Sequence, residues 1–314
     1  MCSNFKLEVP GRICLMGDKV DLLGKPVIGM AISLMMKIKY KENPDNSVEF
    51  YSHNTKEHTK FVLGESPPLN IDLNYWSVLY ERLKKYIKKG FYIDVDSEIP
   101  IGAGLSSSAA LSIGFIKILD IALGLKLSPL QIAELAYLGE NHDLGIKCGR
   151  LDQYTIAYGG IVFIHTDENP RVENLNIKEL PIVVGDSKEE RKAHTILNRI
   201  KRQIQEKDSD TLKAFKVIEK CVYQARRALL RKDFTKLGKL MDLQQEQEKV
   251  LHADTPKILR LCKAAKDAGA LGAKQMGAGG GGCIIAIAPG KQEEVAEAIR
   301  REGGRTWIFD IFRY

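Results

Sequence analysis

The chain has 314 residues, which is enough for two domains of ordinary size. Its 44% hydrophobic and 28% charged residues are typical of a globular protein, not of a disordered or fibrous one. The net charge of +7 is a small excess of 47 basic over 40 acidic residues. This mild bias suits an anionic small molecule such as a nucleotide and does not by itself argue for nucleic acid.

The six cysteines are scattered and form no Cys-x-x-Cys pair. This pattern argues against a zinc site and a disulfide framework, and it fits a reducing cytoplasm. Charged residues near the N-terminus are atypical of a signal peptide. No apolar run approaches the ~18 residues of a membrane span. We therefore expect a cytosolic protein that has no membrane partner.

The first part of the chain has the pattern of strands joined by turns. Runs of β-branched and aromatic residues predict strands at 5–9, 13–16, 27–40 and 48–52. Apolar residues at helical spacing predict an amphipathic helix over 70–89. A strand-like stretch at 91–96 then leads into a turn rich in glycine and serine, and a helix is predicted over 109–125.

Further helices and strands alternate through the rest of the chain. Ser128 and Pro129 predict the start of a helix that runs towards Glu140, because serine caps helices and proline suits the first helical position. A turn and strand are expected at 159–165 and a loop at 167–170. The later elements are a buried strand near 180–186, helices over 191–206, 210–230, 233–252, 255–268 and 293–301, and strands at 284–288 and 306–312.

Strands and helices are mixed in both halves, so we expect an α+β protein. The short buried strand near residue 180 follows a loop, and the long helices begin after it. We therefore predict an N-terminal domain over residues 1–178 and a C-terminal domain over residues 179–314.

The segment 98–111, Glu-Ile-Pro-Ile-Gly-Ala-Gly-Leu-Ser-Ser-Ser-Ala-Ala-Leu, predicts an anion site. Gly102 and Gly104 let a ligand approach the backbone, because they have no Cβ. The helix that follows points unpaired N–H groups and the positive end of its dipole into the same space. The loop lacks the Gly-Lys-Ser/Thr ending of a Walker A loop. The alternative is an ordinary capped helix after a tight turn.

A second glycine loop, residues 277–282, runs directly into a predicted strand and so has no helix dipole. Its N–H groups can still form a backbone nest for an anion. Ordering four consecutive glycines costs chain entropy, and this cost disfavours a plain linker.

Acidic candidates come from two other segments. Asp18, Lys19 and Asp21 follow a predicted strand, where carboxylates can accept hydrogen bonds from substrate hydroxyls; an aspartate-rich turn is the alternative. Glu140, near a helix end, can share Mg²⁺ with a serine hydroxyl and substrate phosphates. Asp152 is a candidate general base, although either acid alone is more often a surface carboxylate. Together these features favour phosphoryl transfer from a nucleotide.

The chain resembles the GHMP kinase superfamily, which includes galactokinase, homoserine kinase, mevalonate kinase and phosphomevalonate kinase. Three family motifs occur in order, at residues 10–17, at 100–110 and at 274–283 (Lys-Gln-Met-Gly-Ala-Gly-Gly-Gly-Gly-Cys). The resemblance covers nearly the whole chain. It implies an N-terminal domain similar to ribosomal protein S5 domain 2, a ferredoxin-like C-terminal domain, and ATP and substrate bound in the cleft between them.

The resemblance also implies roles for individual residues. Asp152 would be the base, or the charge that orients the accepting hydroxyl, with Arg12 near the transferred phosphoryl group. Ser108 and Glu140 would ligate Mg²⁺. ATP would be bound by Pro100, Gly102, Ala103, Gly104, Leu105, Ser106, Ser107 and Ser108. The substrate side of the site would contain Asp18, Lys19, Asp21, Gln153, Ala278 and Gly279.

The motifs favour different acceptors. The stretch 149–154 resembles galactokinases and heptose kinases, and Asp21 aligns with a sugar-binding aspartate of galactokinases, although Asp18 is a shorter acid there and Lys19 replaces a histidine. The stretches 24–32 and 268–274 instead resemble mevalonate kinases. Asp21 would repel mevalonate, which is an anion, whereas buried acceptors can pair with sugar hydroxyls. We therefore expect an ATP- and Mg²⁺-dependent, galactokinase-like sugar kinase, with mevalonate kinase as the alternative.

Two other functions have less support. A sugar sensor without catalysis need not retain the serines, Glu140 and Asp152. A nucleic-acid binder finds little support in the mild charge, so we expect no nucleic-acid partner. The expected partners are ATP and a small hydroxylated substrate, and the chain is expected to be a monomer or a homodimer.

Overall fold

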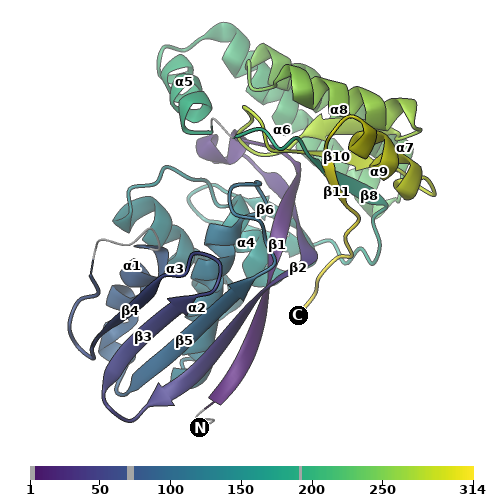
Figure 1. Cartoon of the computed structure of the whole chain (residues 1–314). Helices are drawn as coiled ribbons and strands as arrows, with labels where there is room; N and C mark the ends of the chain where they lie inside the picture. Colours follow the sequence, from purple (N-terminus) through teal and green to yellow (C-terminus); the bar gives the residue numbers. More distant parts are fainter. Residues whose placement is uncertain (1–3, 69–73, 191–192) are drawn as a thin grey trace. The chain divides into compact units, whose positions relative to one another are not determined.

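The computed structural model describes residues 4–68, 74–190 and 193–314 (Figure 1). The chain divides into two compact units. Unit 1 comprises Met1–Gly11, Leu34–Pro100 and Ser106–Tyr158, and unit 2 comprises Arg12–Ser33, Ile101–Leu105 and Gly159–Tyr314. Each unit is therefore made of several stretches that alternate along the chain. The single domain boundary at 178/179 stays a prediction.

The described part of unit 1 combines a sheet with four α-helices. Strand β5 (Gly90–Ser97) pairs with β2 (Val27–Asn43) in antiparallel register and with β3 (Ser47–Ser52) in parallel register. Strand β4 (His58–Val62) pairs with the other side of β3, and β1 (Asn4–Met16) pairs with β2. The helices are α1 (Asn74–Leu83), α2 (Ser107–Leu123), α3 (Pro129–Leu138) and α4 (Leu151–Tyr158) (Figure 1).

The central helix α2 fixes the packing of unit 1. It contacts α1, α3 and α4, and its side chains are mostly buried. It also lies close to β2, because a Cβ on Gly114 would come 2.1 Å from Cδ1 of Ile38. Trp76 of α1 stacks on Phe50 of β3 with ring centroids 4.7 Å apart. These contacts hold α2 in place, and the glycine-rich loop ends at its N-terminus.

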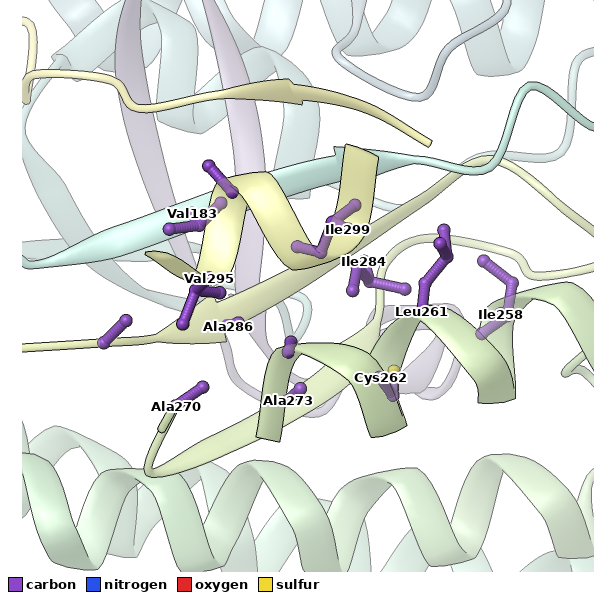
Figure 2. Close-up of a cluster of buried hydrophobic side chains, with 13 residues drawn as sticks. Val183, Ile258, Leu261, Cys262, Ala270, Ala273, Ile284, Ala286, Val295 and Ile299 are labelled. Atoms are coloured by element: carbon purple, nitrogen blue, oxygen red, sulfur yellow. The ribbon is translucent and has the colours of Figure 1, made fainter. Parts of the chain in front are cut away.

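Unit 2 contains an antiparallel sheet in the order β11-β8-β10-β9. Its strands are Arg305–Trp307, Ile182–Asp186, Cys283–Ile287 and Gly272–Gln275. Helices α8 (Pro256–Asp267) and α9 (Gln292–Arg301) pack on it, and α7 (Phe234–Val250) contacts β9. Figure 2 shows the buried apolar side chains of this core, among them Val183, Ile284, Ile258, Leu261, Val295 and Ile299.

The remaining elements of unit 2 lie either before β8 in the chain or between β8 and α7. Helix α6 (Ser209–Leu230) packs on α7, and α5 (Ala193–Gln205) contacts α6. The first residues of β2 pair with β6 (Ile161–His165), which pairs with β7 (Arg171–Asn174). Between β1 and β2 lies the 3-10 turn η1 (Val20–Leu23). Among the described residues, no helix has both the length and the apolar character needed to cross a bilayer.

The predicted α+β class is confirmed, and several element predictions need correction. The strands predicted at 5–9 and 13–16 form the single strand β1, because a strand at a sheet edge tolerates Pro10. The strand predicted at 306–312 is only Arg305–Trp307. The helix predicted over 70–89 begins at Asn74 among the described residues, and positions 69–73 lie outside them. Strands β4, β7 and β9 and helix α4 were not predicted.

Candidate functional site

The glycine-rich loop before α2 is held by its backbone carbonyls. Arg12, buried in β1, donates from Nη1 to the Gly104 carbonyl at 2.8 Å and from its own N–H to the Leu105 carbonyl at 3.1 Å. The Cys283 thiol donates to the Ala103 carbonyl at 3.1 Å. Gly102 is exposed, and no described atom lies within 4 Å of the place where its Cβ would be. The loop is thus fixed on one side and open to a ligand at Gly102.

Helix α2 begins at Ser107 without an ordinary serine cap. Ser106 occupies the N-cap position in the left-handed conformation, with φ 63° and ψ 49°. Its carbonyl accepts the first helical hydrogen bond, from Ala110 at 3.0 Å. Its hydroxyl does not bond to the helix but donates to Oδ2 of Asp152 at 2.6 Å. The alternative of an ordinary capped helix is therefore wrong for this loop.

The predicted metal ligands lie in one neighbourhood of unit 1, around Tyr75 of α1. Tyr75 hydrogen-bonds with Ser108 in the first turn of α2 and interacts electrostatically with Glu140 and Asp152. Burial raises the pKa of Tyr75, the Glu140 carboxylate raises it further, and the hydrogen bond with Ser108 partly opposes this rise. Ser108, Glu140 and Asp152 therefore all interact with the same phenol.

Glu140 is buried in the π-helical turn η3 (Gly139–Asp143), directly after α3. Single π-turns of this kind are frequent at functional sites. Gln153 of α4 donates from Nε2 to Oε2 of Glu140 at 2.7 Å. Gln153 is itself buried, and this hydrogen bond restricts the orientation of the Glu140 carboxylate. The Oε1 atom of Gln153 has no hydrogen-bond partner among the described residues, and the contact of Gln153 with substrate stays a prediction.

The chemistry of these donors fits Mg²⁺. A carboxylate and a hydroxyl are the hard oxygen donors that this ion prefers, and Mg²⁺ typically takes only one or two protein ligands beside phosphate oxygens and water. The described residues contain no group of three or more His, Cys, Asp or Glu side chains arranged for a metal ion. Ser108 and Glu140 are the residues that would hold it.

A second set of predicted residues forms a buried ion network in unit 2. The Asp18 carboxylate accepts from Lys274 of β9, from the backbone N–H of Gly277 and, at 2.7 Å, from Gln244 of α7. Asp18 and Lys274 have 0% side-chain exposure. Burial by itself raises the pKa of Asp18, but Lys274 and Lys19 lower it below its ordinary value.

Lys19 belongs to the same network. Its ammonium lies 2.6 Å from Oε2 of Glu248 on α7 and donates to the Gly277 carbonyl at 2.9 Å. Gln275 also donates to Glu248, at 3.1 Å. Burial raises the pKa of Glu248, against the opposing effect of Lys19. Asp18 and Lys19 are thus occupied by protein groups, and both anchor the start of the glycine loop at Gly277.

The glycine loop 277–282 has a defined conformation fixed by close contacts and hydrogen bonds, and it is not a plain linker. Gly279 has φ +88°, and a Cβ at that position would come 2.1 Å from the Ala253 carbonyl oxygen. Gly280 donates its N–H to the same carbonyl at 2.7 Å, and Ser187 donates to the Gly282 carbonyl at 2.9 Å. Every glycine of the loop has a positive φ. Only glycine suits this path, because a side chain at Gly279 would clash.

The structure groups the predicted site residues into two sets. Ser106, Ser108, Glu140, Asp152 and Gln153 are joined in unit 1 by the contacts around Tyr75 and Asp152. In unit 2, Arg12 holds residues 104 and 105, and Asp18 and Lys19 hold the loop that contains Ala278 and Gly279. Asp21 lies half-buried in the 3-10 turn η1.

Four contributing residues were missed at the level of sequence: Tyr75, Gln244, Glu248 and Lys274. Lys274 stands at the start of the third motif, and of the four residues it is the one whose position in the sequence could have indicated a place in the site. Tyr75 lies in an amphipathic helix, and Glu248 lies among other charged residues of α7. Neither pattern distinguishes an interior polar group from a surface one.

Comparison of the chain with known proteins identifies its family. The model of the GHMP kinases N terminal domain matches residues 74–160, and that of the GHMP kinases C terminal domain matches residues 225–305. The mevalonate kinase of Pyrococcus furiosus is 32% identical, over 98% of this chain and 96% of the relative. The chain belongs to the GHMP kinase family. It is a small-molecule kinase that has an alcohol group as phosphoryl acceptor.

Two further GHMP kinases are similar over their full length. The D-glycero-alpha-D-manno-heptose 7-phosphate kinase of Campylobacter jejuni is 30% identical, over 98% of this chain and 97% of the relative. The crystal structure of the Methanococcus jannaschii mevalonate kinase matches with a TM-score of 0.84 and 27% identity, over 99% of both chains. The predicted family and its two-domain α+β fold are confirmed, and the roles of single residues stay predictions.

Proposed function

We propose that this GHMP kinase transfers the γ-phosphoryl group of ATP to a hydroxyl of mevalonate. The observation that supports this most strongly is similarity over almost the whole of both chains to the P. furiosus mevalonate kinase, together with the match to the M. jannaschii mevalonate kinase structure. Mevalonate kinase was the alternative in the sequence analysis, and this proposal prefers it to the galactokinase-like sugar kinase expected there.

The structure weakens the sequence arguments for a sugar. Those arguments depended on Asp21 and on the Asp152–Gln153 pair. Gln153 is buried against Glu140, and Asp18 is satisfied by Lys274, Gln244 and Gly277. Asp21, half-buried in η1, and Asp152 still favour a hydroxyl-rich acceptor.

In the proposed reaction the hydroxyl oxygen of the acceptor attacks the γ-phosphorus, and the bond between this phosphorus and the ADP oxygen breaks. We assign Asp152 to receive the proton of that hydroxyl. Backbone N–H groups of residues 102–107 and the N-terminus of α2 would bind the phosphates. Mg²⁺ held by Ser108 and Glu140 would neutralise phosphate charge. The products are ADP and a phosphate monoester.

The test is product identification. The purified chain is incubated with ATP, Mg²⁺ and one acceptor at a time: mevalonate, galactose or a heptose 7-phosphate. Mass spectrometry then detects the phosphorylated acceptor, and release of ADP without acceptor is subtracted. We expect a phosphorylated product from mevalonate. Turnover of a sugar with none of mevalonate would overturn the proposal.

A heptose phosphate is the second candidate acceptor. The C. jejuni heptose 7-phosphate kinase is 30% identical to this chain over 98% of this chain and 97% of the relative. The stretch 149–154 and Asp21 favour the same class of acceptor. A phosphorylated heptose 7-phosphate in the assay above would establish this candidate and would keep the assignment of Asp152 intact.

A further inference from the structure

Ser106 combines a costly backbone conformation with a specific side-chain contact. It is a buried, non-glycine residue in the left-handed region, which glycine adopts without steric cost. Its hydroxyl lies 2.6 Å from Oδ2 of Asp152, the distance of a hydrogen bond to a charged acceptor. Since this hydroxyl does not cap α2, the stability of the helix does not account for a serine here.

We propose that Ser106 is a positioning residue that holds the Asp152 carboxylate in the orientation needed to accept a proton from the substrate hydroxyl. The inference rests on the proposed function of Asp152. Asp152 lies half-buried in the first turn of α4, and Ser106 lies at the start of α2. The left-handed turn at Ser106 aims the hydroxyl across to α4. Strain of this kind persists where the surrounding structure enforces it, and it is concentrated at functional sites.

Two substitutions distinguish the effect of the Ser106 hydroxyl from the effect of its backbone strain. Ser106→Gly and Ser106→Ala both remove the hydrogen bond, but only glycine relieves the left-handed strain. We expect kcat to fall by a similar factor in both variants, about 10- to 100-fold, because misorientation of a reacting group costs rate in this range. The KM for ATP and for the acceptor should stay within about 3-fold of the wild type. The melting temperature of Ser106→Gly should exceed that of Ser106→Ala.

Lys126→Gly is the matched control. Lys126 is also a left-handed residue of unit 1, with φ 59°, but it is exposed in the loop after α2. The same relief of strain should leave kcat unchanged there. Asp152→Asn supplies the second reference, because a hydroxyl that acts through Asp152 has nothing to position once the carboxylate is gone. Adding Ser106→Gly to Asp152→Asn should therefore cause no further loss of kcat.

The possible results separate the positioning role of Ser106 from the proposed function of Asp152. Wild-type kcat in Ser106→Gly, while Asp152→Asn is inactive, would overturn the positioning role and leave the proposed function intact. A loss of kcat in Ser106→Ala alone would also overturn it, because activity would then follow backbone strain. Near-normal turnover of Asp152→Asn would remove the proposed base itself.

Discussion

A fully buried carboxylate keeps its charge only where cations and N–H groups replace water, and Asp18 has both. Burial raises its pKa, but Lys274 and Lys19 lower the pKa below the ordinary value of 3.8. Because the pKa is lower in the folded state, Asp18 stabilises the fold above about pH 4, and this contribution is lost as the pH falls through the lowered pKa.

Asp18→Asn should therefore reduce the free energy of unfolding by about 3–5 kcal/mol at neutral pH, because it leaves Lys274 buried without its counter-ion. The loss should be smaller at about pH 3, which is below the ordinary pKa of 3.8, because the unfolded chain then takes up a proton at Asp18 more readily than the folded one. Urea unfolding at both pH values measures this. Glu248→Gln is the control: burial raises the pKa of Glu248, so its pH dependence should have the opposite sign. An equal loss at both pH values would contradict the proposed charge state of Asp18.

Asp21 is the residue that distinguishes the two candidate acceptors. If mevalonate is the acceptor, Asp21→Asn removes a like charge and should leave kcat/KM for mevalonate unchanged or raise it. If Asp21 binds sugar hydroxyls, the same change should lower kcat/KM for the sugar at least about 10-fold, since a charged hydrogen-bond acceptor is lost. Steady-state kinetics with both acceptors measures the difference. A large loss with mevalonate would show that Asp21 takes a direct part in binding this acceptor.

At the scale of elements, the glycine loop 277–282 depends on its close contact with the chain at Ala253. Gly279→Ala should destabilise the protein strongly, because its Cβ would lie 2.1 Å from a backbone oxygen. Gly290→Ala is the matched control: Gly290 also has a positive φ, +69°, but no atom lies within 4 Å of its Cβ position. It should cost only about 1 kcal/mol. Thermal unfolding of both variants measures the contrast, and equal losses would show that strain rather than contact defines the loop.

The sequence predicted the elements that carry their own local signals. Helix α3 has the capping box of Ser128 and Gln131, and α8 begins at Thr255 and Pro256, so both starts could be placed. Strand β9, Gly-Ala-Lys-Gln, has no β-branched residue and becomes a strand only through pairing with β10. Short elements of this kind are defined by their neighbours and not by their composition.

At the scale of the whole molecule, the family and its motifs could be predicted, but the partners of the site residues could not. Lys19 meets Glu248, and Asp18 meets Lys274, across more than 200 positions of the sequence. No local sequence pattern in residues 18–21 indicates that the side chains of Asp18 and Lys19 are buried. The sequence therefore suggested that Asp18 and Lys19 contact substrate, whereas the fold uses them to anchor the second glycine loop.

The central claim is that this GHMP kinase phosphorylates mevalonate. The most direct measurement is kcat/KM with ATP and Mg²⁺ for mevalonate and for a heptose 7-phosphate under identical conditions, with the product identified by mass. The account predicts a kcat/KM for mevalonate at least about 100-fold higher, and loss of this turnover in Asp152→Asn. A higher kcat/KM for the heptose phosphate would contradict it.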